Sequence, residues 1–158
     1  MKHSLKTGLS FGITSGVITT LGLMVGLYAG TKSRMVVIGG ILTIAIADSF
    51  SDALGIHVSE ESELKHTSKE IWLSTLATFV SKFMVSASFL LPVFFLSQNH
   101  AVIVGVLWAI TLLGFFSFYI ARQQKTQPIG VIIEHLVIAM VVVFITHVIG
   151  RWVNTTFY

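Results

Sequence analysis

Two aspartates, Asp48 and Asp52, stand inside an apolar stretch that runs from about Met35 to Val58 and is long enough to cross a bilayer. Because residues four apart share one face of a helix, both carboxylates are expected on the same side. An unpaired aspartate at the centre of a spanning helix costs about 2.5–3.5 kcal/mol on insertion scales. The pair therefore predicts a cationic partner inside the protein, which is a lysine, a proton or a metal ion.

Lys82 is the basic residue placed to serve as that partner, in the middle of a further apolar stretch over residues 71–96. At a rise of 1.5 Å per residue, Asp48 and Lys82 both lie roughly 15–16 Å from the predicted cytosolic ends of their helices. We therefore expect Lys82 to be the counter-charge of Asp48. Two interpretations stay open, namely a structural ion pair between helices and an ion pathway.

A second layer of polar residues is expected nearer the cytosol. Asp52, Glu134 and His135 all lie roughly 9–10 Å from that side by the same helical rise. Carboxylate and imidazole groups suit divalent ions such as Mn²⁺, Fe²⁺ or Zn²⁺, and the absence of cysteine excludes thiolate sites. The sequence thus predicts a metal cluster at this depth, provided that the two helices are neighbours.

The segment after the aspartates is the most polar part of the chain. Acidic and other polar residues follow one another there in steps of three or four: Glu60, Glu63, His66 or Thr67, and Glu70. If the helix continues, these residues line one face and gather cations, with Glu60 and Glu63 as metal ligands. The alternative is a solvated helix face with glutamate–lysine pairs such as Glu61–Lys65.

Composition identifies the chain as an integral membrane protein. Of its 158 residues, 54% are hydrophobic and 11% charged, against about 25% charged in soluble domains, and mean hydropathy is +0.86. The net charge of +3 comes from basic residues that flank apolar stretches, which indicates topology rather than nucleic-acid binding. The chain has neither an HExxH motif nor a clustered His–Asp triad spacing, so the sequence gives no support to an enzyme.

Five apolar stretches predict an all-α fold, a single transmembrane domain over residues 1–158. The expected helices cover about 8–30, 35–58, 71–96, 101–121 and 128–148. Pro92 should bend the end of the third helix, and Pro128 suits the first position of the fifth.

Basic residues favour a cytosolic N-terminus. With five spans, six lysines and arginines fall on the N-terminal side and three on the other: Lys2, Lys6, Lys65, Lys69, Arg122 and Lys125 against Lys32, Arg34 and Arg151.

Glycines recur every fourth residue in the first helix, as two triplets: Gly8, Gly12 and Gly16, then Gly22, Gly26 and Gly30. Such repeats let helices approach closely in lipid. They fit either tight packing within one subunit or a symmetric subunit contact. We expect both triplets at close contacts and at least one near the two-fold axis of a homodimer.

Two segments resemble the vacuolar iron transporter family. Residues 8–14 (GLSFGIT) look like the opening of the family's first helix, and residues 53–63 (ALGIHVSEESE) look like the end of its second. The resemblance implies a homodimer of five-span subunits with cytosolic N-termini. It also implies export of Fe²⁺ and related metals from the cytosol in exchange for protons, along a path at the dimer interface.

Three positions depart from the family pattern. Phe11 stands where the family has an aspartate, Ile44 where it has a glutamate, and Asp52 where it has a methionine. The metal-binding domain that plant-type members carry between helices two and three is absent. Exchange of a thioether for a carboxylate favours a harder cation, such as Mn²⁺.

The sequence therefore predicts a proton-coupled exporter of Fe²⁺ or Mn²⁺ in a plasma or vacuole-like membrane. Asp48 and Asp52 would bind metal and proton alternately, with Glu134 and His135 as further ligands or proton carriers. The metal is cargo, and no resident cofactor is required. The alternative is a non-transporting membrane scaffold whose buried charges only hold helices together.

Overall fold

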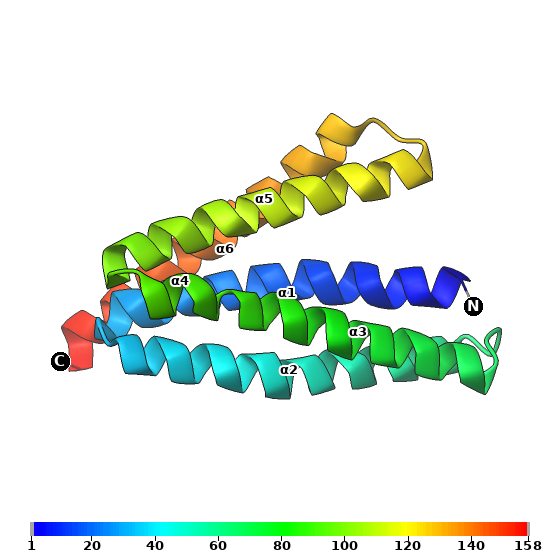
Figure 1. Cartoon of the computed structure of the whole chain (residues 1–158), viewed down its shortest axis with the longest axis horizontal. Helices are drawn as coiled ribbons and strands as arrows, with labels where there is room; N and C mark the ends of the chain where they lie inside the picture. The colour runs from blue at the N-terminus through cyan, green and yellow to red at the C-terminus, as the bar shows by residue number, and fades with distance from the viewer. Residues whose placement is uncertain (1, 158) are drawn as a thin grey trace.

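The computed structural model describes residues 2–157, and these form helices without any strand. The helices are α1 (Lys2–Thr31), α2 (Arg34–Ser62), α3 (Ser68–Ser88), α4 (Leu90–Phe95), α5 (Gln98–Gln124) and α6 (Pro128–Phe157) (Figure 1). Five helical segments are long and apolar enough to cross a membrane, and α3 and α4 together form one of them. The predicted five-helix fold is thus confirmed.

The helices are longer than the apolar stretches that predicted them. α1 begins at Lys2 instead of near residue 8, and α6 continues to Phe157 instead of ending near residue 148. A helix of 30 residues is about 45 Å long, whereas the hydrocarbon core is about 30 Å thick. Hydropathy therefore marks only the part of each helix that suits lipid.

The third predicted span is interrupted near Pro92. α3 ends at Ser88 and α4 begins at Leu90, with Phe89 between them. Proline has no backbone N–H, so the carbonyl of Ser88 loses its helical partner. The indole Nε1 of Trp108 donates to Ser88 Oγ at 2.9 Å, which ties α5 to this interruption. The bend expected at Pro92 is present as a break that lies three residues earlier.

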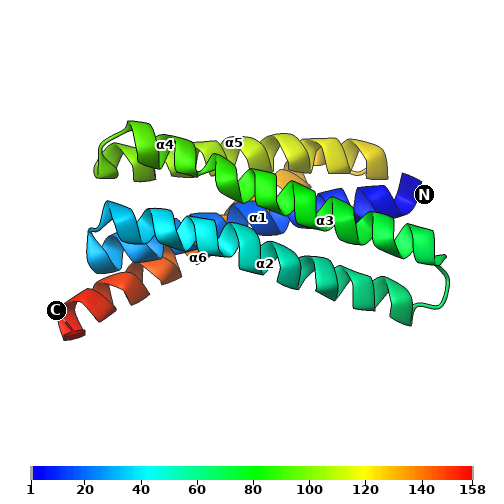
Figure 2. The ribbon, with the colours of Figure 1, turned by 60° about the horizontal axis from the view of Figure 1, so that its bottom comes forward.

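α1 occupies the centre of the bundle. α2 and α3 lie on one side of it and the α5–α6 hairpin on the other (Figure 1), and Figure 2 shows α2 and α3 in front of α1. A Cβ added at Gly8 would lie 2.3 Å from the backbone oxygen of Ser74 in α3. A Cβ added at Gly150 in α6 would lie 2.3 Å from the oxygen of Gly26. Both glycine triplets therefore serve close packing within one chain.

This arrangement assigns a partner helix of the same chain to each glycine triplet. The triplet of Gly8, Gly12 and Gly16 faces α3, and the triplet of Gly22, Gly26 and Gly30 faces α6. The prediction of close helix contacts is confirmed for both. The expected position of one triplet near a two-fold axis stays a prediction.

Candidate functional site

A lysine enclosed between two aspartates lies at the middle of the apolar spans. Lys82 of α3 has no exposed side-chain surface, and its Nζ lies 2.5 Å from Asp48 Oδ2 and 2.5 Å from Asp52 Oδ2, both on α2. The two aspartates are one helical turn apart, so a single ammonium between them reaches both carboxylates. We call Asp48, Lys82 and Asp52 the charged triad.

Ser15 of α1 completes this polar centre. Its hydroxyl donates to Asp52 Oδ2 at 2.6 Å, and Lys82 Nζ donates to Ser15 Oγ at 3.0 Å. The three N–H groups of the ammonium thus face three oxygen-bearing side chains. Ser15 was not among the residues that the sequence singled out. Its signal was its place between Gly12 and Gly16, on the stretch of α1 that approaches α3.

The charges of the triad do not balance. Two carboxylates share one ammonium, which leaves a net negative charge when both acids are ionised. Lys82 is sealed inside the bundle, whereas 30% of the Asp48 side chain and 19% of the Asp52 side chain are exposed. Each carboxylate therefore has one side held by lysine and another side accessible from outside the subunit. That open side can receive a proton or a second cation.

The predicted cluster of Asp52, Glu134 and His135 does not form within one chain. α2 packs on α1, α3 and α4, whereas α6 packs on α1 and α5. Glu134 is exposed, and His135 Nδ1 lies 2.7 Å from Ser117 Oγ of α5. Equal depth did not bring these residues together, because α1 lies between the two helices. Asp52 instead joins Asp48 on Lys82, where the sequence placed Asp48 alone.

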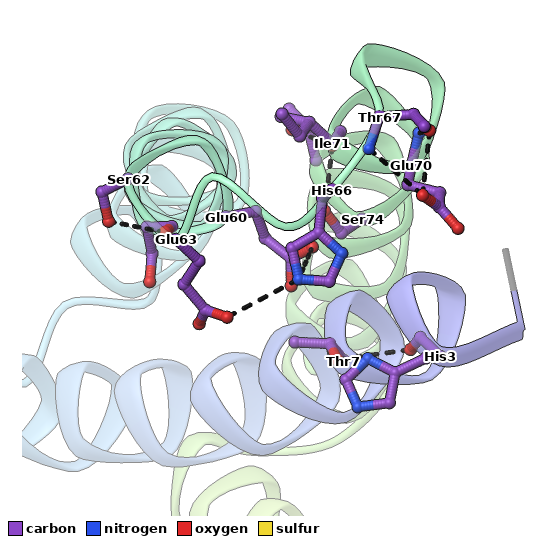
Figure 3. A network of polar contacts seen from close by, with 12 residues as sticks. His3, Thr7, Glu60, Ser62, Glu63, His66, Thr67, Glu70, Ile71 and Ser74 are labelled. Carbon is purple, nitrogen blue, oxygen red and sulfur yellow. Dashed lines mark hydrogen bonds and ion pairs between the residues drawn. The ribbon is translucent and has the colours of Figure 1, made fainter.

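A second polar group lies at the end of α2 (Figure 3). His66 Nε2 lies 3.7 Å from Glu60 Oε2 and 3.6 Å from Glu63 Oε2, too far for hydrogen bonds, and the His3 ring stacks on the His66 ring at 6.4 Å between centroids. Glu60 is only 6% exposed, and its Oε2 has no hydrogen-bond partner among residues 2–157. These residues join the start of α1 to the connection between α2 and α3.

This geometry corrects the prediction of a continuous helix whose acidic residues line one face. α2 ends at Ser62, so Glu63 is its C-terminal cap and His66 lies in the connection. Glu70 belongs to the next helix, where it forms a capping box with Thr67. A capping box satisfies backbone N–H groups that begin a helix, which explains why a new helix starts here. Glu60 and Glu63 meet through His66 rather than along one helix.

No group of three or more histidine, aspartate or glutamate side chains within residues 2–157 is arranged to hold a metal ion. The residues expected as ligands are instead divided among three places. Asp48 and Asp52 lie in the charged triad, Glu60 and Glu63 lie beside His66, and His135 lies with Ser117, next to the exposed Glu134. A metal ion at the triad would have to compete with Lys82 for the carboxylates.

The apolar helices fit one class, that of polytopic α-helical membrane proteins. No family model matches the chain, and no curated protein or solved structure matches it significantly. Arguments about its function therefore rest on the residues of the chain itself, above all on the charged triad.

Removing the ammonium should expose the energetic coupling within the triad. Lys82→Met leaves two adjacent carboxylates without their cation, so we expect a loss of about 3–5 kcal/mol in the free energy of unfolding. Adding Asp48→Asn and Asp52→Asn to that variant should recover part of the loss. Thermal unfolding in detergent measures both effects. Lys69→Met, which removes an exposed lysine from the same helix, is the control. Strictly additive losses would contradict the coupling.

Proposed function

We propose that this chain is a secondary transporter that moves a divalent cation across a membrane in exchange for protons, and that it works as a homodimer. The observation that carries the proposal is the charge ratio of the triad, in which two carboxylates share one buried ammonium in mid-span. An uncompensated charge at this depth is costly, and a bound proton or metal ion removes that cost. Occupancy of the open side of the aspartates is therefore favourable.

Lys82 serves in this proposal as a built-in competitor for the transported cation. A dication that reaches Asp48 and Asp52 from their open side weakens the hold of the carboxylates on the ammonium, because like charges repel. When the metal leaves, lysine and a proton neutralise the carboxylates again. Metal binding requires deprotonated ligands, so binding of metal and release of protons are linked. This linkage gives exchange rather than simple leakage.

The ligand chemistry of the triad favours hard or borderline dications. Carboxylate oxygens of Asp48 and Asp52 and the hydroxyl of Ser15 meet at Lys82. Oxygen ligands suit Mn²⁺ and tolerate Fe²⁺, and no sulfur atom takes part. The resemblance of residues 8–14 and 53–63 to vacuolar iron transporters supports the same class of cargo. It also supports export from the cytosol, with a cytosolic N-terminus.

A homodimer would cover the open side of the aspartates with protein. The outward face of α2 carries small residues at every fourth position, all exposed: Gly39, Thr43, Ala47, Ser51 and Gly55. A Cβ at Gly39 or Gly55 would meet no atom within 4 Å, so a second helix has room to approach there. Small residues favour such approaches in lipid. Two copies joined at this face would enclose a path between their triads.

The scaffold remains the second candidate, because the triad also joins three helices. Ser15 comes from α1, the aspartates from α2 and the lysine from α3, and direct contacts link all of them. A buried ion pair of this kind can be purely structural. The two candidates differ in one observable, which is the movement of ions.

Flux through the reconstituted protein tests the proposal. Liposomes that contain the protein and an internal metal-sensitive dye should take up Mn²⁺ or Fe²⁺ faster than empty liposomes, and a pH dye should report protons moving the other way. Absence of metal flux for every dication tested would favour the scaffold. Light scattering of the detergent-solubilised protein should give the mass of a dimer, and a monomer would exclude the path between subunits.

A further inference from the structure

A cleft opens between the beginning of α1 and the end of α5, away from the charged triad. Its volume is about 430 Å³. In Figure 1 the α5–α6 hairpin diverges from α1 toward the N-terminal end of α1, and side chains from both helices line the opening. None of the residues that line the cleft was assigned to cation transport above.

The lining of the cleft changes from polar to apolar along the helices. The mouth is formed by His3, Lys6 and Thr7 from the first two turns of α1 and by Gln123 and Gln124 from the last turn of α5. The deeper wall is formed by apolar residues of the same two helices: Leu9, Ile13, Phe116 and Ile120. The polar layer thus lies at the helix ends, and the apolar layer lies toward the centre of the spans.

The charge of the mouth is positive. Lys6 lines it, none of the described residues that line it is an aspartate or a glutamate, and Arg122 and Lys125 flank the two glutamines in sequence. Arg122 lies 5.2 Å from the ring of Phe118, which places its cation on the same end of α5. Such a mouth repels the divalent cation of the proposed transport and attracts an anion. Basic pockets between spanning helices are typical binding sites of acidic lipid headgroups.

We propose that this cleft binds an anionic phospholipid. The phosphate lies at Lys6 and His3, with the amides of Gln123 and Gln124 as further donors, and one acyl chain follows the wall of Leu9, Ile13, Phe116 and Ile120. A lipid satisfies both layers at once, whereas a free phosphate ion uses only the mouth. The proposal is independent of cation transport, because no residue of the triad takes part.

Lipid retention by the purified protein tests this site. The whole chain is reconstituted in nanodiscs with equal amounts of phosphatidylglycerol and phosphatidylcholine, transferred to mild detergent and analysed by native mass spectrometry. We expect one phosphatidylglycerol to stay bound in preference to phosphatidylcholine. Lys6→Gln removes the basic contact and should lower that preference about fivefold, the value of one lysine at an anionic surface. Lys69→Gln removes an exposed lysine outside the cleft and should leave the preference for phosphatidylglycerol unchanged.

A second variant tests the cleft without changing charge. Ser10 also lines the cleft, and Ser10→Trp should fill it and displace the lipid. Equal retention of the two lipids by the unaltered protein would overturn the proposal. So would unchanged retention in both Lys6→Gln and Ser10→Trp. Displacement of phosphatidylglycerol by millimolar inorganic phosphate would show that the mouth binds free anions, and would equally overturn the assignment to a lipid.

Discussion

Metal flux should fall about 100-fold or more when Asp52 is replaced by asparagine. The amide keeps the shape of the side chain but removes the charge, so Lys82 and Asp48 would then form a neutral pair. A neutral pair no longer attracts a dication. Substitutions at residues that only support metal ligands lower metal affinity or activity about 10–100-fold. Loss of a carboxylate that binds the ion directly should therefore lower the flux by at least the upper value of that range. Manganese and iron uptake into proteoliposomes measures the effect.

The stability of the same variant separates transport from a structural role. Asp52→Asn removes one of two competing carboxylates, so the folded protein should be as stable as before or more so. Glu61→Gln, which neutralises an exposed carboxylate of the same helix, should leave flux unchanged. Flux of the unaltered protein should also fall in acid on the metal-loading side, because protons compete for the carboxylates. Wild-type flux in Asp52→Asn would remove the triad from the mechanism and leave the scaffold as the better account.

Gly12→Ala should destabilise the fold by about 1–3 kcal/mol, and Gly12→Leu by more. A Cβ at Gly12 would lie 2.1 Å from Ser81 Oγ and 2.6 Å from the backbone oxygen of Thr78, so α1 and α3 must separate. Separation would also draw Ser15 away from Lys82. Thermal unfolding in detergent, followed by tryptophan fluorescence, measures the loss. The effect belongs to the packing of the single chain rather than to a subunit contact.

Gly114→Ala provides the matched control. The same substitution in α5 would place a Cβ with no atom within 4 Å. Since alanine is a better helix former than glycine, this change should be neutral or slightly stabilising. If the two variants unfold at the same temperature, the close approach of α1 to α3 is not a source of stability.

Helix depth predicted part of the charged triad and missed the rest. Asp48 and Lys82 lie at similar heights, and their contact is confirmed at 2.5 Å. Asp52 is one turn lower, about 6 Å along the axis, and was therefore assigned to another layer. The long lysine side chain lies between the two heights and contacts both acids. Height alone cannot say how far a flexible side chain reaches along its neighbour.

The order of the helices around the bundle likewise could not be predicted from the sequence. Hydropathy predicts each of the five spans, because twenty or so apolar residues are needed to cross a bilayer. It does not say that α1 separates α2 from α6, which is why Asp52 and Glu134 do not meet within one chain. The glycine triplets did signal close contacts. Their partners, α3 and α6, became evident only in three dimensions.

The central position of α1 has a consequence for the synthesis of the protein. Its second glycine face is closed by α6, where Gly150 contacts Gly26 and Asn154 Nδ2 donates to the oxygen of Gly30 at 2.8 Å. Ribosomes add about 5–20 residues per second, so α1 waits on the order of 10 s for that partner to be synthesised. During this interval the face is occupied by lipid or by the insertion machinery. A nascent chain that stalls before α6 therefore keeps the second glycine face of its first helix without its partner helix.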